Sequence, residues 1–204
     1  MRTPLIMSWI RHHVDAITFA GEYLEDLSRA ITELPLKLVV ELVDAVDEVR
    51  INGGTVHLIG NGGSAGTPSH SAGDWSKELS MRTICHMDNV SALTAWANDT
   101  DYNNVFAASL DIYLQEGDLL IAYSGSGNSK NVLKGVALAQ EKGVKVAAIT
   151  GDYKGGGGGH LAAMADIPII CPTTSMERIE DFQLIINHII KEAIKDRHGL
   201  TSSC

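Results

Sequence analysis

The segment from Ser124 to Ser129, with the order Ser-Gly-Ser-Gly-Asn-Ser, combines glycines with hydroxyl side chains. It follows an apolar run at 118–123 and precedes a helical pattern at 130–142. Glycine lets the backbone approach a ligand closely, a helix N-terminus offers unpaired N–H groups, and hydroxyls add donors. The order therefore predicts a phosphate-binding loop, and the lack of lysine and arginine in it favours a phosphorylated metabolite over a polyphosphate. A serine-rich turn that only caps the helix is the alternative.

A second glycine-rich turn, Gly-Asn-Gly-Gly-Ser at 60–64, follows a short apolar run that predicts a strand at 55–60. Neither turn matches G-x-x-x-x-G-K-[ST] or G-x-G-x-x-G. In open parallel sheets, ligands bind beyond the carboxyl ends of the strands. Both turns follow predicted strands, so they are expected at the same edge of the sheet, and each supports the phosphate interpretation of the other. His57, inside the strand pattern, is expected to be a core histidine rather than a ligand.

Two pairs of ionisable residues have helical spacing. His70 and Asp74 are four residues apart, so they lie on one helix face, and both residue types can bind metal or transfer protons. Glu180 and His188 are eight residues apart, about 12 Å along a helix. One metal could use both only if their side chains reached toward each other or another subunit supplied ligands. The alternatives are a solvated surface for Asp74 and Glu180, and a buried structural role for His188.

Strand and helix patterns alternate along the chain and must position these residues. The predicted strands lie at 55–60, 83–87, 118–123, 144–149 and 167–171, and Pro168 suits an edge strand. The predicted helices lie at 5–33, 35–50, 67–79, 89–97, 103–114, 130–142 and 177–196. Thr67 and Pro68 fit the N-cap and first turn of the third helix, and the glycine-rich stretch 152–160 is expected to be a mobile loop.

This alternation predicts an α/β fold, a doubly wound and mostly parallel five-stranded sheet flanked by helices. The whole chain, 1–204, is expected to form one domain. It would consist of N-terminal helices within 1–53, an α/β core at 55–196 and a tail at 197–204. The apolar N-terminal helices either pack against a neighbouring subunit or cover the chain's own sheet.

Composition excludes several classes of protein. The chain has a formal net charge of −9 and no basic block, so nucleic acid is not an expected partner. Its three widely spaced cysteines fit reduced thiols better than a disulfide framework or a metal site. No apolar run is long enough to span a membrane, and the N-terminus lacks a signal-peptide pattern. A cytoplasmic protein with no membrane partner is expected.

Several of these stretches together resemble a known family. They are the turn at 60–64 with His70 in the following helix, Ala97-Asn98-Asp99 with Tyr102 just after, Ser124 to Ser129, Thr150-Gly151 with its glycine-rich loop, and Arg178-Ile179. This set resembles the SIS (sugar isomerase) domain family and, within it, the phosphoheptose (sedoheptulose 7-phosphate) isomerases. The resemblance covers nearly the whole chain, to about Asp196.

The resemblance implies an SIS-type αβα sandwich and a homotetramer with active sites at subunit interfaces. It implies a phosphorylated sugar substrate, with substrate contacts at Asn61, Gly62, Gly63, Ser64, Asp99, Ser124, Ser126, Asn128, Ser129 and Glu177. It implies a divalent metal, most often zinc and one per active site, held by His70, Asp74, Glu180 and His188. The catalytic acid/base pair falls on Asp74 and His188.

Four features depart from the family pattern. Asp74 stands where glutamate is usual, Glu180 where glutamine is usual, and Gly125 where threonine is usual, and the helix after Ser64 carries Thr67-Pro68. Two histidines and two carboxylates still suit zinc, and also manganese or iron. If Asp74 binds the metal tightly it becomes a poorer base, and Glu180 is then the substitute catalytic carboxylate.

The implied reaction converts sedoheptulose 7-phosphate to D-glycero-D-manno-heptose 7-phosphate through an enediol. Two alternatives stay open from the sequence. One is an isomerase for a different sugar phosphate, and the other is a non-catalytic SIS protein that binds a phosphosugar or a protein partner.

Overall fold

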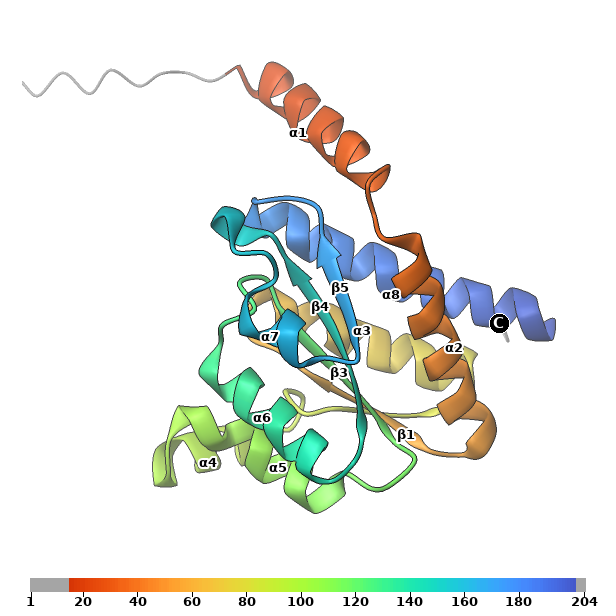
Figure 1. The fold of residues 1–204 in the computed structure, drawn as a ribbon, viewed down its shortest axis with the longest axis vertical. Helices are drawn as coiled ribbons and strands as arrows, with labels where there is room; N and C mark the ends of the chain where they lie inside the picture. The colour runs from red at the N-terminus through yellow and green to blue at the C-terminus, as the bar shows by residue number, and fades with distance from the viewer. Residues whose placement is uncertain (1–14, 201–204) are drawn as a thin grey trace, which may run out of the picture.

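A five-stranded parallel sheet forms the centre of the molecule in the computed structural model, which describes residues 15–200 (Figure 1). The strand order is β2-β1-β3-β4-β5. The strands are β1 (Thr55–Ile59), β2 (Arg82–Cys85), β3 (Leu119–Ser124), β4 (Lys145–Gly151) and β5 (Ile167–Cys171). Every neighbouring pair is parallel, so all five strands present their carboxyl ends at one edge. The doubly wound α/β prediction is confirmed.

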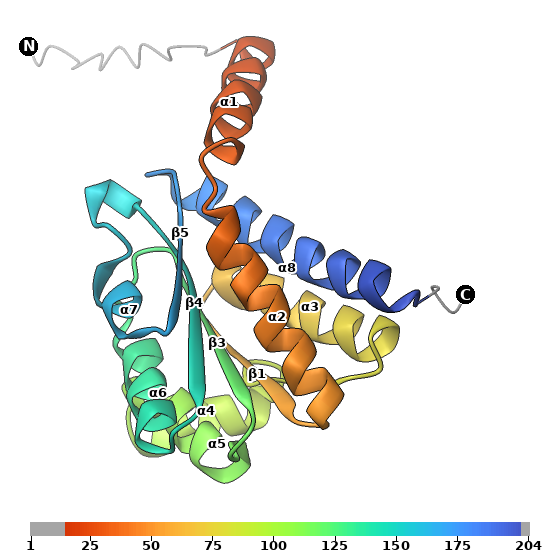
Figure 2. The same ribbon diagram turned by 45° about the vertical axis from the view of Figure 1, so that its right-hand side comes forward.

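Helices cover both faces of the sheet (Figures 1 and 2). One face carries α2 (Leu36–Asn52), α3 (Gly63–Glu78) and α8 (Met176–His198). The other carries α4 (Val90–Asp99), α5 (Val105–Tyr113), α6 (Lys130–Glu141) and α7 (Gly159–Met164). Two short 3₁₀ turns, η1 (Tyr102–Asn104) and η2 (Tyr153–Gly155), precede α5 and α7.

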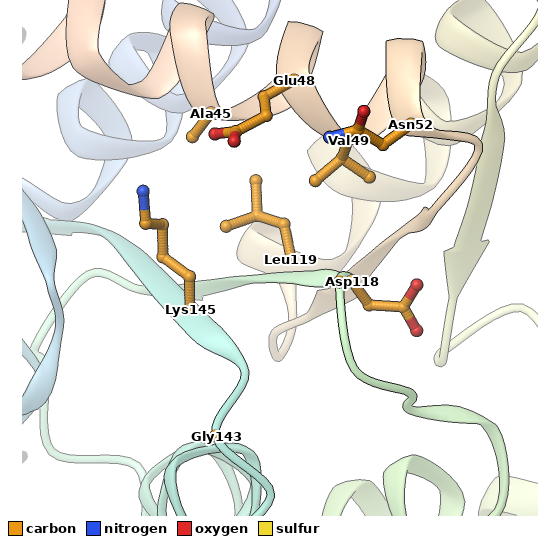
Figure 3. Close-up of a pocket in the computed structure, with 9 residues that line it drawn as sticks. Ala45, Glu48, Val49, Asn52, Asp118, Leu119, Gly143 and Lys145 are labelled. Atoms are coloured by element: carbon orange, nitrogen blue, oxygen red, sulfur yellow. The ribbon is translucent and has the colours of Figure 1, made fainter.

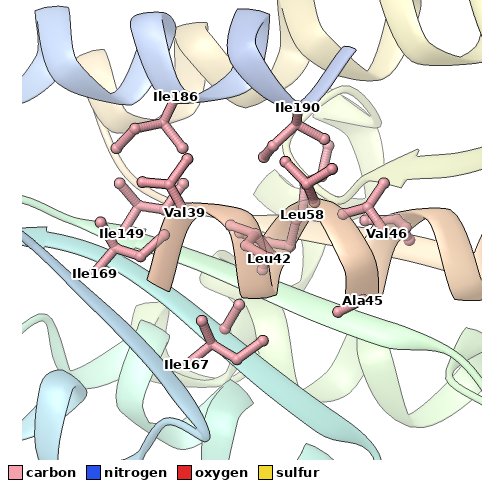
Figure 4. Packing of buried hydrophobic residues seen from close by; sticks show 14 of the residues in the cluster. Val39, Leu42, Ala45, Val46, Leu58, Ile149, Ile167, Ile169, Ile186 and Ile190 are labelled. Carbon is pink, nitrogen blue, oxygen red and sulfur yellow. The ribbon is translucent and has the colours of Figure 1, made fainter. Parts of the chain in front are cut away.

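The central strand β3 is buried on both faces, as a parallel sheet between two helix layers requires. Its alternating side chains divide between two hydrophobic clusters: Leu119, Ile121 and Tyr123 face α2, α3 and α8, whereas Leu120 and Ala122 face α5 and α6. Figure 4 shows the first cluster, in which branched side chains of α2 and α8 meet those of β4 and β5. This packing fixes α8 beside α3, and that contact builds the site described below.

Helix α1 (Ala16–Ile31) projects away from these layers (Figures 1 and 2). Its only buried residue is Ala30, and Ile17 and Leu24 expose 83% and 64% of their surface. Its contact with α8 is polar and aromatic: Arg178 stacks 4.4 Å from the ring centre of Tyr23 and pairs with Asp26 at 3.1 Å. An apolar helix held by so few contacts leaves a hydrophobic surface uncovered in the single chain.

The strand predictions are confirmed to within a few residues, and Pro168 lies on the edge strand β5. The predicted start of the third helix was wrong. Gly62, with φ of 58°, turns the chain directly out of β1, so α3 begins at Gly63 and Thr67 and Pro68 lie inside it. The helix N-terminus therefore falls within the glycine-rich turn itself, where its N–H groups can face a ligand.

The stretch 152–160 is more structured than the predicted loop. It contains η2 and the first residues of α7, a helix that the sequence pattern did not reveal. The Asp152 carboxylate accepts a 2.8 Å hydrogen bond from the N–H of Gly157 and so closes the turn between them. The predicted helical positions at 5–14 and residues 201–204 of the predicted tail lie outside the described residues. The last helix continues to His198, two residues into the range predicted as tail. Within the described part, no helix is long and apolar enough to cross a membrane.

Candidate active site

Both glycine-rich turns border one cavity at the carboxyl ends of β1 and β3. Its volume is about 110 Å³. It is lined by Asn61, Ser64, Tyr123, Ser124, Gly125, Ser126, Ser129, Met176 and Glu180. Hydroxyl groups and helix N-termini dominate this lining, and no lysine or arginine belongs to it. The cavity thus has the donors that a single phosphate group needs.

Hydrogen bonds within the protein hold the serine loop at the edge of the cavity. The Ser126 hydroxyl accepts a 3.3 Å hydrogen bond from the N–H of Asn128. Asn128 donates to the backbone carbonyl of Ser126 at 2.8 Å, and its amide oxygen accepts from the ring of His160 at 2.7 Å. Ser129 is the N-cap of α6 yet makes no side-chain capping bond. Its hydroxyl lies 3.3 Å from that of Ser124, so two hydroxyls converge on one point.

Asn61 is fixed by Asn131, which the sequence analysis missed, and by Tyr102, which belongs to one of the stretches that carry the family resemblance. Its amide exchanges two hydrogen bonds with buried Asn131, at 2.8 and 2.9 Å. The Tyr102 hydroxyl also donates to the Asn61 side-chain oxygen at 2.8 Å. These bonds hold Asn61 at the rim of the cavity. The available sequence signal for Asn131 was its position two residues after Ser129, the N-cap residue of α6.

The carboxylate of Glu180 lies against Gly63 at the start of α3. A Cβ atom at position 63 would come within 2.2 Å of this carboxylate, so the close approach requires glycine. The Gly62 N-cap has no side chain to bond the helix N–H groups. Burial, with smaller contributions from Glu177 and Asp181, raises the pKa of Glu180. The added carboxylate therefore borders the phosphate cavity and favours its protonated form more than an exposed glutamate would.

A second group of polar side chains lies where α3 packs on α8. His70 Nε2 is 3.4 Å from His188 Nε2 and 3.5 Å from Asp74 Oδ2, and the three ligand atoms all lie within 4.8 Å of one another. Ligands bonded to tetrahedral zinc at about 2.0–2.1 Å stand roughly 3.4 Å apart. The spacing therefore fits a divalent metal with three protein ligands and an open position, the usual layout of a catalytic zinc site.

Glu180 does not belong to this group. Among the described residues, the atoms that converge are those of His70, Asp74 and His188. Glu180 lies two turns before His188 on α8 and faces the phosphate cavity instead. The long rise between the two positions, noted from the sequence, keeps them apart in this single chain.

Two other expected substrate contacts lie outside the cavity lining. Asp99 is exposed at the end of α4, where its carboxylate accepts from Asn98, and Glu177 accepts from the hydroxyl of Ser175 at 2.9 Å. Neither lines the cavity of the single chain. Gly62, Gly63 and Asn128 shape the two turns and contribute no side chain to its lining.

Lys191 and Met176 are site residues that the sequence analysis did not identify. The Lys191 ammonium group donates to Asp74 Oδ2 at 3.0 Å. Its position three residues after His188, on the same helix face, was a usable signal. Met176 fills the space beside Gly125, since a Cβ atom there would lie 2.3 Å from the methionine sulfur.

A larger hollow lies at the opposite ends of the strands (Figure 3). Its volume is about 240 Å³, and Glu48 of α2 faces Lys145 of β4 across it. Because α/β sheets bind ligands at the carboxyl ends of their strands, this hollow is not the candidate site.

Known proteins share both the sequence and the fold. Residues 21–151 match the family model described as SIS domain. The phosphoheptose isomerase of Chlorobaculum parvum is 32% identical over 185 residues, 87% of each chain, and that of Rhodospirillum rubrum is 36% identical over 149 residues, 71% of this chain and 77% of the relative. The solved structure of phosphoheptose isomerase from Neisseria gonorrhoeae superposes with a TM-score of 0.80 at 27% identity, covering 89% of this chain and 99% of the other. The chain belongs to the SIS domain family, in the branch of the phosphoheptose isomerases.

Proposed function

We propose that this protein is an aldose–ketose isomerase that converts sedoheptulose 7-phosphate to D-glycero-D-manno-heptose 7-phosphate. Relatives named phosphoheptose isomerase, at about a third identity over most of the chain, support the enzyme class. The cavity of serine hydroxyls and the His-Asp-His group supply the two parts that such a reaction needs. These are a binding site for the phosphate and groups that transfer protons at the other end of the sugar.

The strongest support for a long sugar phosphate is the distance between the serine cavity and the His-Asp-His group. Helix α3 bears Ser64 at the cavity and His70 at the metal group, and α8 bears Glu180 and His188 in the same order. Six residues of helix rise about 9 Å, and eight rise about 12 Å. A seven-carbon sugar, with its phosphate at one end and its carbonyl near the other, spans a separation of this size. A triose phosphate is too short to do so.

The chain's own residues perform the proton transfers. The serine loops bind the phosphate and so orient the first two carbons of the ketose. Asp74 takes a proton from carbon 1 and returns it to carbon 2, while His188 moves a proton from the hydroxyl on carbon 1 to the oxygen on carbon 2. If Asp74 is committed to the metal, Glu180 is the substitute base. Its carboxylate borders the phosphate cavity in the single chain, so it would have to turn away from Gly63 toward the reacting carbons to act.

A divalent metal, zinc in our proposal and one per site, would be held by His70, Asp74 and His188. Such an ion supplies positive charge for the oxygens at the reacting carbons. Glu180, the fourth ligand expected from the family resemblance, would have to turn away from Gly63 to join this set.

We further propose that the working form is a homotetramer with active sites between subunits. The uncovered apolar side of α1 supports an oligomer. The expected contacts Asp99 and Glu177 would then reach a neighbouring subunit's site. The whole chain acts as one domain in this proposal, with the N-terminal helices in oligomer packing. The buried, unpaired thiols of Cys85 and Cys171 suit the reducing cytoplasm.

Turnover of sedoheptulose 7-phosphate by metal-replete protein, followed by NMR as aldose formation, tests this function. We expect Asp74→Asn and His188→Ala each to lower turnover at least about 100-fold, the scale of a lost general acid or base. We expect a chelator to abolish turnover and added zinc to restore it. Circular dichroism shows whether each variant stays folded.

Full activity in either folded variant would contradict these roles. Binding without turnover would instead support the phosphosugar-binding alternative. In the wild type, turnover of another ketose phosphate in preference to sedoheptulose 7-phosphate would show that the substrate differs. A different substrate is the main alternative, because Met176 beside Gly125 and the carboxylate of Glu180 both line the phosphate cavity.

A further inference from the structure

Lys191 is an ammonium group enclosed by carboxylates beside the proposed metal ligands. Its side chain is 12% exposed, and its Nζ lies 3.0 Å from Asp74 Oδ2, 3.5 Å from Glu78 Oε1 and 3.6 Å from Glu192 Oε1. The first two acids come from α3 and the third from α8 itself. These carboxylates compensate the charge of the largely buried lysine, which would be strongly destabilising without a partner.

The Asp74 oxygen that Lys191 holds is the same one that faces the histidines. Oδ2 of Asp74 accepts from Lys191 and lies 3.5 Å from His70 Nε2. A metal bound by His70 and His188 would therefore share this oxygen with a fixed positive charge. Aspartate is also a short side chain with few rotamers. The hydrogen bond from the Lys191 ammonium group therefore restricts the orientation of the Asp74 carboxylate.

We propose that Lys191 is a positioning residue of the active site, which orients Asp74 toward the two histidines and weakens metal binding by sharing its carboxylate. This inference rests on the proposed function for the identity of the site, but it concerns metal affinity, which can be measured without substrate. Loss of a group that holds a metal ligand usually costs 10- to 100-fold in metal affinity. Lys191 is a cation that competes with the metal for the Asp74 carboxylate and repels it, so we expect its removal to act in the opposite direction and strengthen binding.

Titration of the full-length protein with Co²⁺, followed by its visible absorption, measures the effect. We expect Lys191→Met to bind Co²⁺ about tenfold more tightly than the wild type, and Lys191→Arg, which keeps the charge, to stay near wild type. Lys195→Met is the matched control. Lys195 is equally exposed on the same helix, and it pairs with Glu78 at 2.6 Å and with Glu192 at 3.8 Å. We expect its affinity to change less than twofold.

Equal or weaker Co²⁺ binding by Lys191→Met would overturn the proposal, as would an equal gain in Lys195→Met, which would indicate a general charge effect. If Lys191→Met melts at a lower temperature, Lys191→Gln provides a second test with a polar replacement. Turnover assays on the same proteins separate the two proposals. If Lys191→Met binds Co²⁺ more tightly but the wild type shows no turnover, the isomerase function is contradicted and the role of Lys191 remains. Turnover by the wild type, with the same Co²⁺ affinity in Lys191→Met as in the wild type, would support the isomerase function and remove the role of Lys191.

Discussion

Single glycines determine how closely the two turns approach their neighbours. Gly63 leaves room for the Glu180 carboxylate and Gly125 for the Met176 sulfur, both of them ends of flexible side chains. Gly127 differs, because its neighbour is backbone: a Cβ atom there would lie 1.8 Å from the carbonyl oxygen of Gly158. Its φ of 64° is also in the left-handed region. Glycine at this position thus allows the serine loop to pack directly against the backbone of the turn before α7.

We expect Gly127→Ala to lower the free energy of unfolding by at least about 2 kcal/mol, since neither backbone can move aside cheaply and alanine resists this φ. Gly66→Ala is the control. Gly66 lies inside α3, and a Cβ atom there meets nothing within 4 Å. It should be neutral or stabilising, by up to about 1 kcal/mol. Urea unfolding of both variants measures the difference, and equal stabilities would contradict the packing argument.

Secondary-structure elements on one side of the sheet are tied together by a buried chain of hydrogen bonds. His57 of β1 lies 3.1 Å from Asp118 Oδ2 and 2.9 Å from His86, whose other ring nitrogen lies 2.7 Å from the Ser109 hydroxyl of α5. With Asp118 ionised, each group in the chain donates toward it: Ser109 to His86, His86 to His57, and His57 to the carboxylate. This order requires both imidazoles to be neutral.

Burial lowers the pKa of His57, and burial together with the neighbouring His57 lowers the pKa of His86 to about 3. The unfolded chain, with histidine pKa values of about 6.5, binds protons that the folded protein cannot. We therefore expect full stability above about pH 7. Below pH 6.5 the free energy of unfolding should fall by up to about 1.4 kcal/mol per pH unit for each histidine.

Urea unfolding between pH 7.5 and 5 measures this slope. Carboxylates contribute little in that range, because their ordinary pKa values lie near 4. A free energy of unfolding that stays constant from pH 7 to 5 would show that the two histidines take up protons in the folded state.

At the scale of the whole molecule, the single chain leaves an apolar surface uncovered. Figures 1 and 2 show α1 standing clear of the two helix layers, and the exposed apolar residues continue from α1 to Leu36 and Val40 of α2. Covering this surface with a second copy of the chain would bury it without rearranging the sheet. The proposed tetramer gives the N-terminal helices that role. Packing on the chain's own core applies to α2 and, in α1, to Ala30 and the partly buried Leu27.

We expect Phe19→Asp to lower the molar mass in solution from that of the assembly to that of a smaller species, because a charge would enter an apolar interface. Phe19 is 54% exposed in the single chain, so the change should leave the fold of the monomer intact. Light scattering after size-exclusion chromatography measures the mass. Glu25→Ala, on the same helix, is the control and should keep the wild-type mass. A monomeric wild type, or an unchanged mass in Phe19→Asp, would contradict the arrangement.

The sequence by itself determined the features that depend on local spacing. Apolar runs predicted the five strands, glycine-rich turns after two of them predicted that both turns lie at one edge of the sheet, and the interval from His70 to Asp74 placed both on one helix face. Such features follow from the repeat of a strand or a helix, which residue order alone defines.

The tertiary structure decided which separate elements meet. Packing of the apolar faces of α3 and α8 brings His188 to His70, sets Lys191 on Asp74 and leaves Glu180 at the phosphate cavity. The same kind of contact joins His57 to His86. Each of these pairs depends on how two elements pack and how far along each other they are shifted. Local spacing does not specify that shift, because many registers bury similar apolar surface.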